Sequence, residues 1–310
     1  MRNEDVTRIA HDCGFELAGV ATAGPVADFP RYAAWVERGD AGEMRYLTDH
    51  RAQIRSDVRN LLPSARSVIC VGKLYNATGP EPQAGDAEIS RYAWGRDYHE
   101  VMKASLEEMT RRLLALESFE YKVCVDTAPL LERSLAREAG LGWIGKNTCL
   151  INEPRGSWFF LGEIVTSLEL EADAPPADRC GSCTRCIEAC PTQALVPEGD
   201  QWTLDSRRCI SYLTIELRGP IPEEMHAGIG THVFGCDICQ DVCPWNRRAP
   251  VTSDAAFQGS RVTLEEIAGM TAEEFRVRFR GTPVWRTKQA GMLRNVEIAM
   301  KNATAAPGDE

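Results

Sequence analysis

Residues 180–191 read CGSCTRCIEACP, and this stretch decides the fold of the second half of a chain of 310 residues. Its cysteines have the spacing C-x2-C-x2-C-x3-C, followed by proline. In bacterial ferredoxins, three thiolates of such a run bind one [4Fe-4S] cluster and the fourth binds a second cluster. The run therefore predicts that a second set of cysteines lies elsewhere in the chain.

The second set is present in a stretched form. Cys236, Cys239 and Cys243 lie in GCDICQDVCP, and Cys209 lies upstream in DSRRCISYL. The crossing rule gives each cluster three ligands from one run and one ligand from the other. We therefore predict two [4Fe-4S] clusters, one bound by Cys180, Cys183, Cys186 and Cys243 and the other by Cys190, Cys209, Cys236 and Cys239.

Disulfides and zinc are the rival interpretations of these cysteines. Disulfides need an oxidising compartment, whereas MRNEDVTRIAHDCG has neither an apolar signal core nor a twin-arginine pair, which indicates a reduced, cytoplasmic setting. Zinc would be satisfied by C-x2-C pairs and has no use for two C-x3-C-P endings. The cluster interpretation is therefore favoured.

Composition describes an ordinary globular protein, with 44% hydrophobic and 26% charged residues. No apolar stretch approaches the length of a membrane span, so no membrane association is expected. A net charge of −10 argues against a broadly basic nucleic-acid-binding surface. Residues 261–301, however, hold eight Lys or Arg against five Glu, which is compatible with a local basic face or with a solvated helical tail of mixed charge.

The first 175 residues alternate between strand and helix patterns, which predicts an α/β (α+β) domain. β-branched runs bounded by turn residues predict strands within 15–22, 67–75, 121–127 and 158–171. Residues 99–117 space their apolar side chains near the helical period and are expected to form an amphipathic helix against the sheet.

Three consecutive domains are predicted. The Ala-, Pro- and Asp-rich stretch EADAPPADR is a linker, so 1–175 is assigned to the α/β domain and 176–250 to a ferredoxin-like two-cluster domain. Residues 251–310 are predicted to form a short, basic helical tail whose end, ATAAPGDE, is disordered.

Two places in the first domain carry candidate proton-transfer groups. Asp126 ends the strand YKVCVD, at the sheet edge where α/β proteins bind ligands, but an Asp there is equally suited to cap the next helix. Asp97 and His99 lie among aromatic residues in ISRYAWGRDYHE. Helix capping and core packing are the commoner roles of such residues, and the pattern leaves both roles open.

AGLGWIGKN contains G-x4-G-K, but it is not a phosphate-binding P-loop. Asn147 follows Lys146 in place of the Ser or Thr that would bind Mg²⁺, and the segment follows a helix pattern where a P-loop follows a strand. Its glycines are expected to end that helix and to let the backbone approach another group closely.

With these motifs established, the chain resembles the epoxyqueuosine reductase family, which performs the last step of queuosine synthesis in tRNA. Nearly the whole chain takes part in the resemblance, in family order. The matching stretches are MRYLTDH, ISRYAWGRDYH, VDTAPLLERSLAREAGLGWIGKNTCLI, GSWFFLGEI, CGSCTRCIEACPTQA, CISYLTIELRGPIP, GCDICQDVCPWN and GMLRNVEIAMKN.

The resemblance implies a base-off cobalamin in the α/β domain, and D-x-H-x-x-G, which supplies a lower His ligand in other cobalamin enzymes, is indeed missing. Two clusters would feed electrons to a cob(I)alamin-level species that reduces the epoxide with loss of water. Asp126 matches the family's proton donor, and Asp97 and His99 match polar active-site residues. The implied cofactor contacts are Arg55, Trp143, Lys146 and Asn147.

The resemblance further implies a tRNA carrying epoxyqueuosine as substrate and an external electron donor such as a flavodoxin or ferredoxin. We expect a cytoplasmic monomer. Many members continue into helical repeats that help to hold tRNA, and this sequence reaches Glu310 without them. Two alternatives are an electron-transfer subunit without chemistry of its own and a reductive dehalogenase, which shares these cofactors but usually carries a twin-arginine signal.

Overall fold

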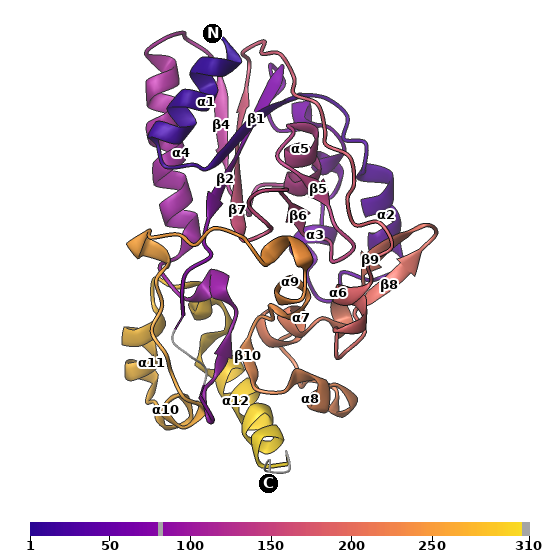
Figure 1. The fold of residues 1–310 in the computed structure, drawn as a ribbon, viewed down its shortest axis with the longest axis vertical. Coiled ribbons are helices and arrows are strands. Elements are labelled where there is room, and N and C mark those ends of the chain that lie inside the picture. The colour runs from indigo at the N-terminus through magenta and orange to yellow at the C-terminus, as the bar shows by residue number, and fades with distance from the viewer. Residues whose placement is uncertain (80–82, 306–310) are drawn as a thin grey trace. The chain divides into compact units, whose positions relative to one another are not determined.

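The computed structural model describes residues 1–79 and 83–305 (Figure 1). The chain forms two compact units, each built from separated segments. The first unit comprises Met1–Tyr75, His99–Cys183 and Pro244–Pro250, and the second comprises Asn76–Tyr98, Thr184–Cys243 and the chain from Val251 onward.

The first unit is built on a sheet of order β1-β2-β7-β4 in which every neighbouring pair is antiparallel. Its strands are β1 (Leu17–Thr22), β2 (Ser67–Leu74), β7 (Phe159–Thr166) and β4 (Tyr121–Cys124). The four predicted strands are thus confirmed. All residues of the central strand β2 are buried, because helices cover both faces of the sheet.

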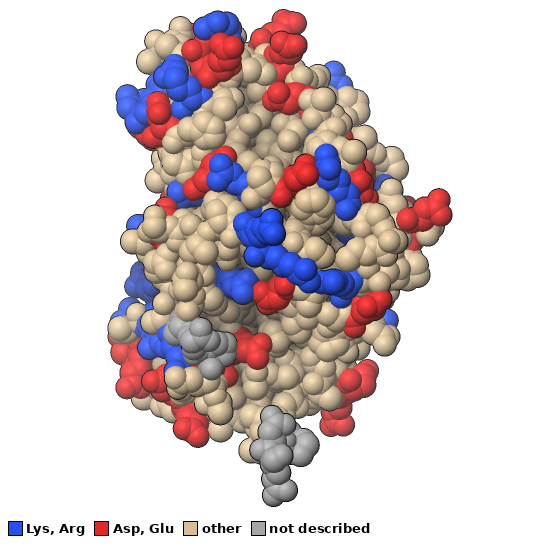
Figure 2. Space-filling view, in the orientation of Figure 1, with Lys and Arg blue, Asp and Glu red and all other residues tan. Residues whose placement is uncertain are grey.

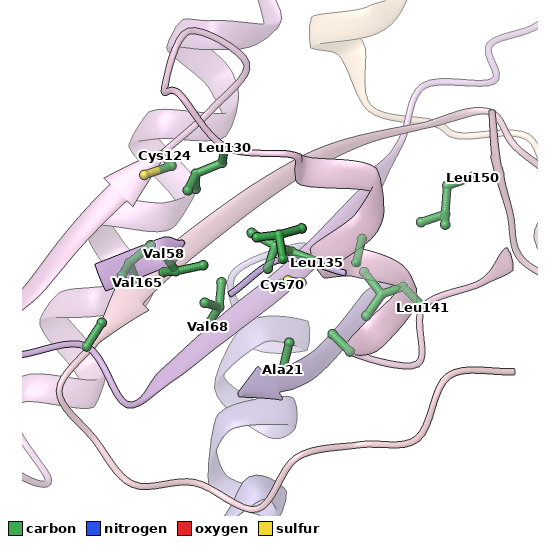
Figure 3. Packing of buried hydrophobic residues seen from close by; sticks show 14 of the residues in the cluster. Ala21, Val58, Val68, Cys70, Cys124, Leu130, Leu135, Leu141, Leu150 and Val165 are labelled. Carbon is green, nitrogen blue, oxygen red and sulfur yellow. The ribbon is translucent and has the colours of Figure 1, made fainter. Parts of the chain in front are cut away.

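Helices α1 (Asn3–Asp12) and α4 (Tyr98–Leu114) cover one face, where Met102 and Leu106 of α4 reach Gly162 on β7. Helix α5 (Glu132–Glu138) covers the other face, and Figure 3 shows the apolar cluster there, which includes Cys70, Cys124 and Leu135. β1 passes close beneath the end of α5, because a Cβ on Gly19 would lie 2.0 Å from the carbonyl oxygen of Ala139.

Shorter elements complete the first unit. They are α2 (Phe29–Glu37), α3 (Arg45–Thr48), the 3-10 helices η1 (Gln53–Ser56), η2 (Val58–Asn60) and η5 (Pro244–Asn246), and the strands β5 (Trp143–Ile144) and β6 (Leu150–Ile151). β5 and β6 pair as a small antiparallel hairpin that contains the loop of residues 145–149.

The second unit holds the predicted cluster cysteines from Cys186 to Cys243, whereas Cys180 and Cys183 belong to the first unit. Its strand β3 (Glu88–Ile89) pairs in parallel with β10 (His232–Phe234), and β8 (Leu195–Glu198) forms a hairpin with β9 (Gln201–Leu204). Its helices are α6 (Arg185–Glu188), α7 (Ile210–Ile215), α8 (Glu223–Ile229), α9 (Ile238–Asp241), α10 (Leu264–Gly269), α11 (Ala272–Phe279) and α12 (Lys288–Ala305), with the 3-10 turns η3 (Arg91–Ala93), η4 (Ser206–Arg208), η6 (Ala255–Phe257) and η7 (Pro283–Thr287). α6 packs against α9, so the two cysteine runs are neighbours.

The three consecutive segments predicted from the sequence do not coincide with these two units. Residues 76–98 leave the first half of the chain and join the unit of the cysteines, and the tail beyond residue 250 joins it too. Apolar burial is the physical reason: Ala93 packs in one core with Phe234, Met292 and Val296. Of the predicted disordered end, residues 303–305 continue α12, and 306–310 lie outside the described residues.

The basic residues counted in 261–301 are largely engaged with partners inside the second unit. Ion pairs join Arg261 to Asp86, Arg276 to Glu273, Arg286 to Glu216 and Lys301 to Glu297. Figure 2 shows positive and negative side chains side by side on the visible face. This favours the interpretation of a helical tail with mixed charge. No helix in the described part of the chain is long and apolar enough to cross a membrane.

Arg294 and Asn295, in the GMLRN stretch, fasten α12 to its own unit. The Arg294 guanidinium donates to the carbonyl oxygens of Leu213, Leu217 and Gly219 at 2.6–2.8 Å. The buried Asn295 amide donates to the carbonyl oxygens of Thr214 and Val233. These side chains therefore have a structural role, and the hydrogen bonds that they make connect three segments of the chain.

Replacing Arg294 by Ala is expected to lower the free energy of unfolding by about 3 kcal/mol, because the carbonyl oxygens that it serves lose a charged donor. Anaerobic urea unfolding followed by circular dichroism measures the change. Lys301→Ala on the same helix, which breaks only an exposed pair with Glu297, is the control and should cost less than about 0.5 kcal/mol. Equal losses in the two variants would show that Arg294 is not the fastening residue.

Candidate functional site

His99 and Asp126 meet in the first unit. The Nε2 atom of His99, on the first turn of α4, lies 3.1 Å from Oδ2 of Asp126, which follows β4. About 50% of the Asp126 side chain and 33% of the His99 side chain are exposed. The contact joins an acid and a base that the sequence placed 27 residues apart, and both remain accessible to a substrate.

Asp126 does not cap a helix. α5 begins only at Glu132, and Asp126 adopts the left-handed conformation with φ of 52°, which few residues other than glycine tolerate as well as Asp and Asn. Its backbone N–H donates to Oε1 of Glu132 at 2.5 Å. The neighbouring strand β7 is antiparallel to β4, so the ligand-binding edge expected of a parallel sheet does not explain the position of Asp126. The turn itself presents the side chain.

A second acidic group lies below this turn. Glu163 on β7 faces Cys70 on β2 and Cys124 on β4 across the sheet register, and its side chain is fully buried. Within the described residues, neither of its carboxyl oxygens has a hydrogen-bond donor. The carboxyl of Glu132, on α5, faces the Glu163 carboxyl and interacts with it.

Burial shifts both of these acids in the same direction. Burial, and then the negative charge of Asp126, raise the pKa of Glu132 to about 7. Burial and the charge of Glu132 raise the pKa of Glu163 well above its ordinary value. Because two carboxylates in contact repel each other and no donor separates them, the pair is most stable with a proton between the two groups.

The loop between β5 and β6 holds the first cysteines of the 180–191 run. Lys146 Nζ donates to the carbonyl oxygens of Gly181 and Cys183 at 2.7 and 2.9 Å. Burial raises the pKa of the Cys180 thiol, while the backbone N–H of Lys146 and the indole of Trp143 favour its thiolate. Lys146 thus holds the segment of the predicted cluster ligands Cys180 and Cys183, and Trp143 lies near Cys180.

The other predicted cofactor contacts are buried in the first unit. The Asn147 side chain accepts the N–H of Cys149 at 3.2 Å and shapes the same loop. Arg55, on η1, donates to the carbonyl oxygen of Tyr46 and lies 5.7 Å from the ring centre of Tyr32. Its Nη1 atom is buried and has no hydrogen-bond partner among the described residues.

Asp97 precedes α4 directly. Its backbone N–H donates to the carbonyl oxygen of Gly281 at 2.7 Å within the second unit. The structure therefore brings His99 and Asp126 together as one pair and ties Asp97 to a different part of the chain.

Three predicted ligands of one cluster gather in the second unit. Cys209 interacts electrostatically with Cys190 and Cys236, and the backbone N–H groups that follow Cys209 point at its sulfur. The N–H of Ala194 donates to Cys190 Sγ at 3.3 Å. This grouping supports the crossed assignment of Cys190, which stays a prediction. Among the described residues, no three His, Cys, Asp or Glu side chains converge as around a single metal ion.

His232 lies beside the same cysteines and was not singled out from the sequence. Its Nδ1 atom is 2.9 Å from the carbonyl oxygen of Ile229, and its Nε2 atom is 3.0 Å from Oε2 of Glu88. The ring also contacts Cys236. A lone histidine outside the C-x2-C spacing carries no signal in the sequence, so only the fold reveals this neighbour.

Replacing Lys146 by Ala is expected to make release of cluster iron to a chelator about tenfold faster, because groups that orient metal ligands contribute about that much to metal affinity. The iron released anaerobically is measured against time. Lys103→Ala, which breaks only an exposed pair with Glu107 on α4, is the matched control. Identical release rates in the two variants would contradict a role for Lys146 in holding the Cys180–Cys183 segment.

Comparison with known proteins identifies the family to which this chain belongs. Residues 179–246 match the family model "4Fe-4S double cluster binding domain", and residues 55–127 match the model "Epoxyqueuosine reductase QueG, DUF1730". The epoxyqueuosine reductase of Xanthomonas campestris is 41% identical over 98% of this chain and 87% of its own length. The chain belongs to the epoxyqueuosine reductase family. The Gloeobacter violaceus epoxyqueuosine reductase is 43% identical over 97% of this chain and 95% of its own.

Solved structures agree with this family. A crystal structure of an epoxyqueuosine reductase with a tRNA-Tyr epoxyqueuosine-modified tRNA stem loop is similar to this chain with a TM-score of 0.90 and 29% identity. It is matched over 98% of this chain and 82% of that one. A catabolic reductive dehalogenase shares the fold at a TM-score of 0.52 and only 14% identity. The predicted fold class and the predicted family are confirmed.

Proposed function

We propose that Asp126, paired with His99, donates a proton to the epoxide oxygen when epoxyqueuosine in tRNA is reduced to queuosine. Conversion of the epoxide to the alkene consumes two electrons and two protons and releases the oxygen as water. The observation that carries the assignment is the contact of 3.1 Å between His99 Nε2 and Asp126 Oδ2 on an exposed turn. An acid so placed can reach a substrate, and the histidine can return a proton to it.

Cobalamin and two [4Fe-4S] clusters are the cofactors of the reaction, and cobalamin, when bound, would supply the two electrons that reduction of the epoxide needs. The residues of the first unit fit such a cofactor. The buried Nη1 atom of Arg55 has no hydrogen-bond acceptor among the described residues, and a carbonyl or amide oxygen of the cofactor would supply one. We propose Arg55 and Asn147 as cofactor contacts. Trp143 and Lys146 are proposed to act beside the clusters, through Cys180 and Cys183.

The two clusters are proposed to have the crossed ligand sets given by the sequence. A single-electron carrier such as a flavodoxin or ferredoxin is the proposed donor, because each cluster accepts one electron at a time. We propose a monomer that acts in the cytoplasm, where thiolate ligands stay reduced. We propose that residues 1–175, 176–250 and 251–310 carry, in this order, the cobalamin-binding residues, the cluster-binding cysteines and the helical tail. These three segments are not three separate folding units.

The substrate is tRNA, and the base that reacts lies in the anticodon loop. Bases in such loops are unstacked readily and can enter a pocket that a duplex base cannot reach. Asp97, at the start of α4, is proposed to contact the substrate, since it lies two residues from His99 in the chain.

Anaerobic reconstitution tests the function. The cluster-loaded protein is incubated with cobalamin and desalted, its visible spectrum is recorded, and it is then given a chemical reductant and tRNA containing epoxyqueuosine. Retained base-off cobalamin and queuosine in the digested tRNA are expected. Clusters without retained cobalamin, and no queuosine, would favour an electron-transfer subunit instead.

A further inference from the structure

Beneath the Asp126 turn, the mechanism leaves unexplained a carboxyl pair formed by the buried Glu163 and the half-buried Glu132. Glu163 is fully buried in an otherwise apolar strand, and its oxygens have no donor in the described part of the chain. A buried carboxylate without a donor is costly, so the group must carry a proton or share one. The facing carboxyl of Glu132 is the acceptor that such a proton would reach.

Glu132 connects this pair to the catalytic turn. One of its oxygens accepts the N–H of Asp126 and so supports the left-handed backbone at that residue. Its charge also faces the Asp126 carboxyl. A negative charge near a carboxyl favours the protonated form of that carboxyl, which is the form a proton donor needs. Because half of the Asp126 side chain is exposed, its own burial supplies little of this effect.

We propose that Glu163 and Glu132 are positioning residues for Asp126. Glu163 keeps a proton between its own buried carboxyl and the half-buried carboxyl of Glu132 at neutral pH, and the charge on Glu132 helps Asp126 to hold its own proton until donation. This inference rests on the proposed role of Asp126 as the proton donor. It assigns Glu163 no contact with substrate or cofactor.

Other titratable groups surround the Glu132–Glu163 pair and Asp126, and each favours either the charged or the protonated form of its neighbour. Cys70 and Cys124 flank Glu163, and burial raises the pKa of both thiols, an effect to which the negative charge shared by the carboxyl pair adds, so both thiols stay neutral. Arg133 interacts with Glu132 and favours its charged form. A protonated His99 favours the charged form of Asp126, whereas the charge on Glu132 favours its protonated form. The balance of these two neighbours therefore sets the proton affinity of Asp126.

Infrared spectroscopy of the cluster-loaded, cobalamin-bound protein tests where the proton lies. A protonated carboxyl absorbs apart from carboxylates and amides. The wild type is expected to show one such band at neutral pH that Asp126→Asn leaves in place and Glu163→Gln removes. Absence of the band in the wild type, or its survival in Glu163→Gln, would overturn the shared proton.

The role of the charge is tested by titrating Asp126 itself. The Asp126 band is identified by its loss in Asp126→Asn, and its midpoint is expected to move about one pH unit lower in Glu132→Gln. Glu138→Gln, which removes a charge from the same helix at a residue paired with Arg137, is the matched control and should leave the midpoint in place. Equal midpoints in the wild type and Glu132→Gln, or equal shifts in both variants, would overturn the proposal.

The pH dependence of turnover gives the functional readout. A donor is active while protonated, so activity falls as pH rises through the midpoint of Asp126. In Glu132→Gln this alkaline limb is expected about one pH unit lower, whereas Glu163→Gln, whose neutral amide still donates to Glu132, should keep the wild-type limb. The infrared titration needs no turnover. A wild type that reduces no epoxyqueuosine would therefore refute the proposed function, while the titration still decides the carboxyl pair.

Discussion

Replacing Asp126 by Asn lowers the rate of epoxyqueuosine reduction by at least about 100-fold, while the clusters and cobalamin stay bound. General acid catalysis contributes about 10²–10⁴-fold, and an amide keeps the shape of the side chain but cannot supply the proton. His99 lies 3.1 Å from the Asp126 carboxyl and, in the proposed mechanism, returns a proton to Asp126, so it is not expected to replace the donor. Single-turnover reduction of modified tRNA, with the visible spectrum recorded on the same sample, measures both effects.

Asp12→Asn is the control for this variant. Asp12 ends α1 in the same unit and pairs only at 3.8 Å with Arg8 on the surface, so its loss should not change the rate. If Asp126→Asn kept the rate within about threefold of the wild type, Asp126 would not be the donor. Absence of queuosine formation by the wild type and by every variant would instead favour an electron carrier with no chemistry of its own.

The sequence predicted the sheet of the first unit because its signal is local. Strands such as SVICVGKL bury every side chain, and β-branched runs between turn residues need no partner to be recognised. The cysteine spacing is similarly local. Strand direction is not, and the antiparallel order β1-β2-β7-β4 was not specified by any pattern in the chain.

The site was predicted only in part, because its contacts join distant segments. Asp126 and His99 were separate candidates, and nothing in either stretch indicated that they touch. Glu163 was missed for a different reason. Within WFFLGEIV, a single acid is expected to mark the solvent face of a strand, but α5 covers that face and brings Glu132 to it. Only packing distinguishes a solvated glutamate from a buried one.

The interleaving of the two units was also outside the reach of local patterns. EADAPPADR was assigned as a boundary because it is rich in Pro and Ala, yet Cys183 still belongs to the first unit. The Lys146 side chain explains this position, since it donates to the carbonyl oxygens of Gly181 and Cys183. The linker composition of 171–179 therefore does not mark the boundary between the two units, which falls after Cys183.

The crossed assignment of the cluster ligands predicts how much iron each cysteine variant binds. Cys190→Ser is expected to lower bound iron by about half and to abolish turnover, because one of two clusters loses a thiolate. Cys190→Ser combined with Cys209→Ser should lose no more iron than either change alone, since both cysteines are assigned to one cluster. Cys190→Ser combined with Cys243→Ser should remove nearly all iron.

Iron and sulfide analysis of anaerobically reconstituted variants measures these losses, with Cys149→Ser, outside both ligand sets, as the control. The crossed pattern is distinctive because Cys190 is nearer in sequence to Cys186 than to any partner assigned to it. The interaction of Cys209 with both Cys190 and Cys236 in the second unit favours the crossed set. If Cys190→Ser with Cys209→Ser removed both clusters, while Cys190→Ser with Cys186→Ser removed one, each run would bind its own cluster and the crossed assignment would be wrong.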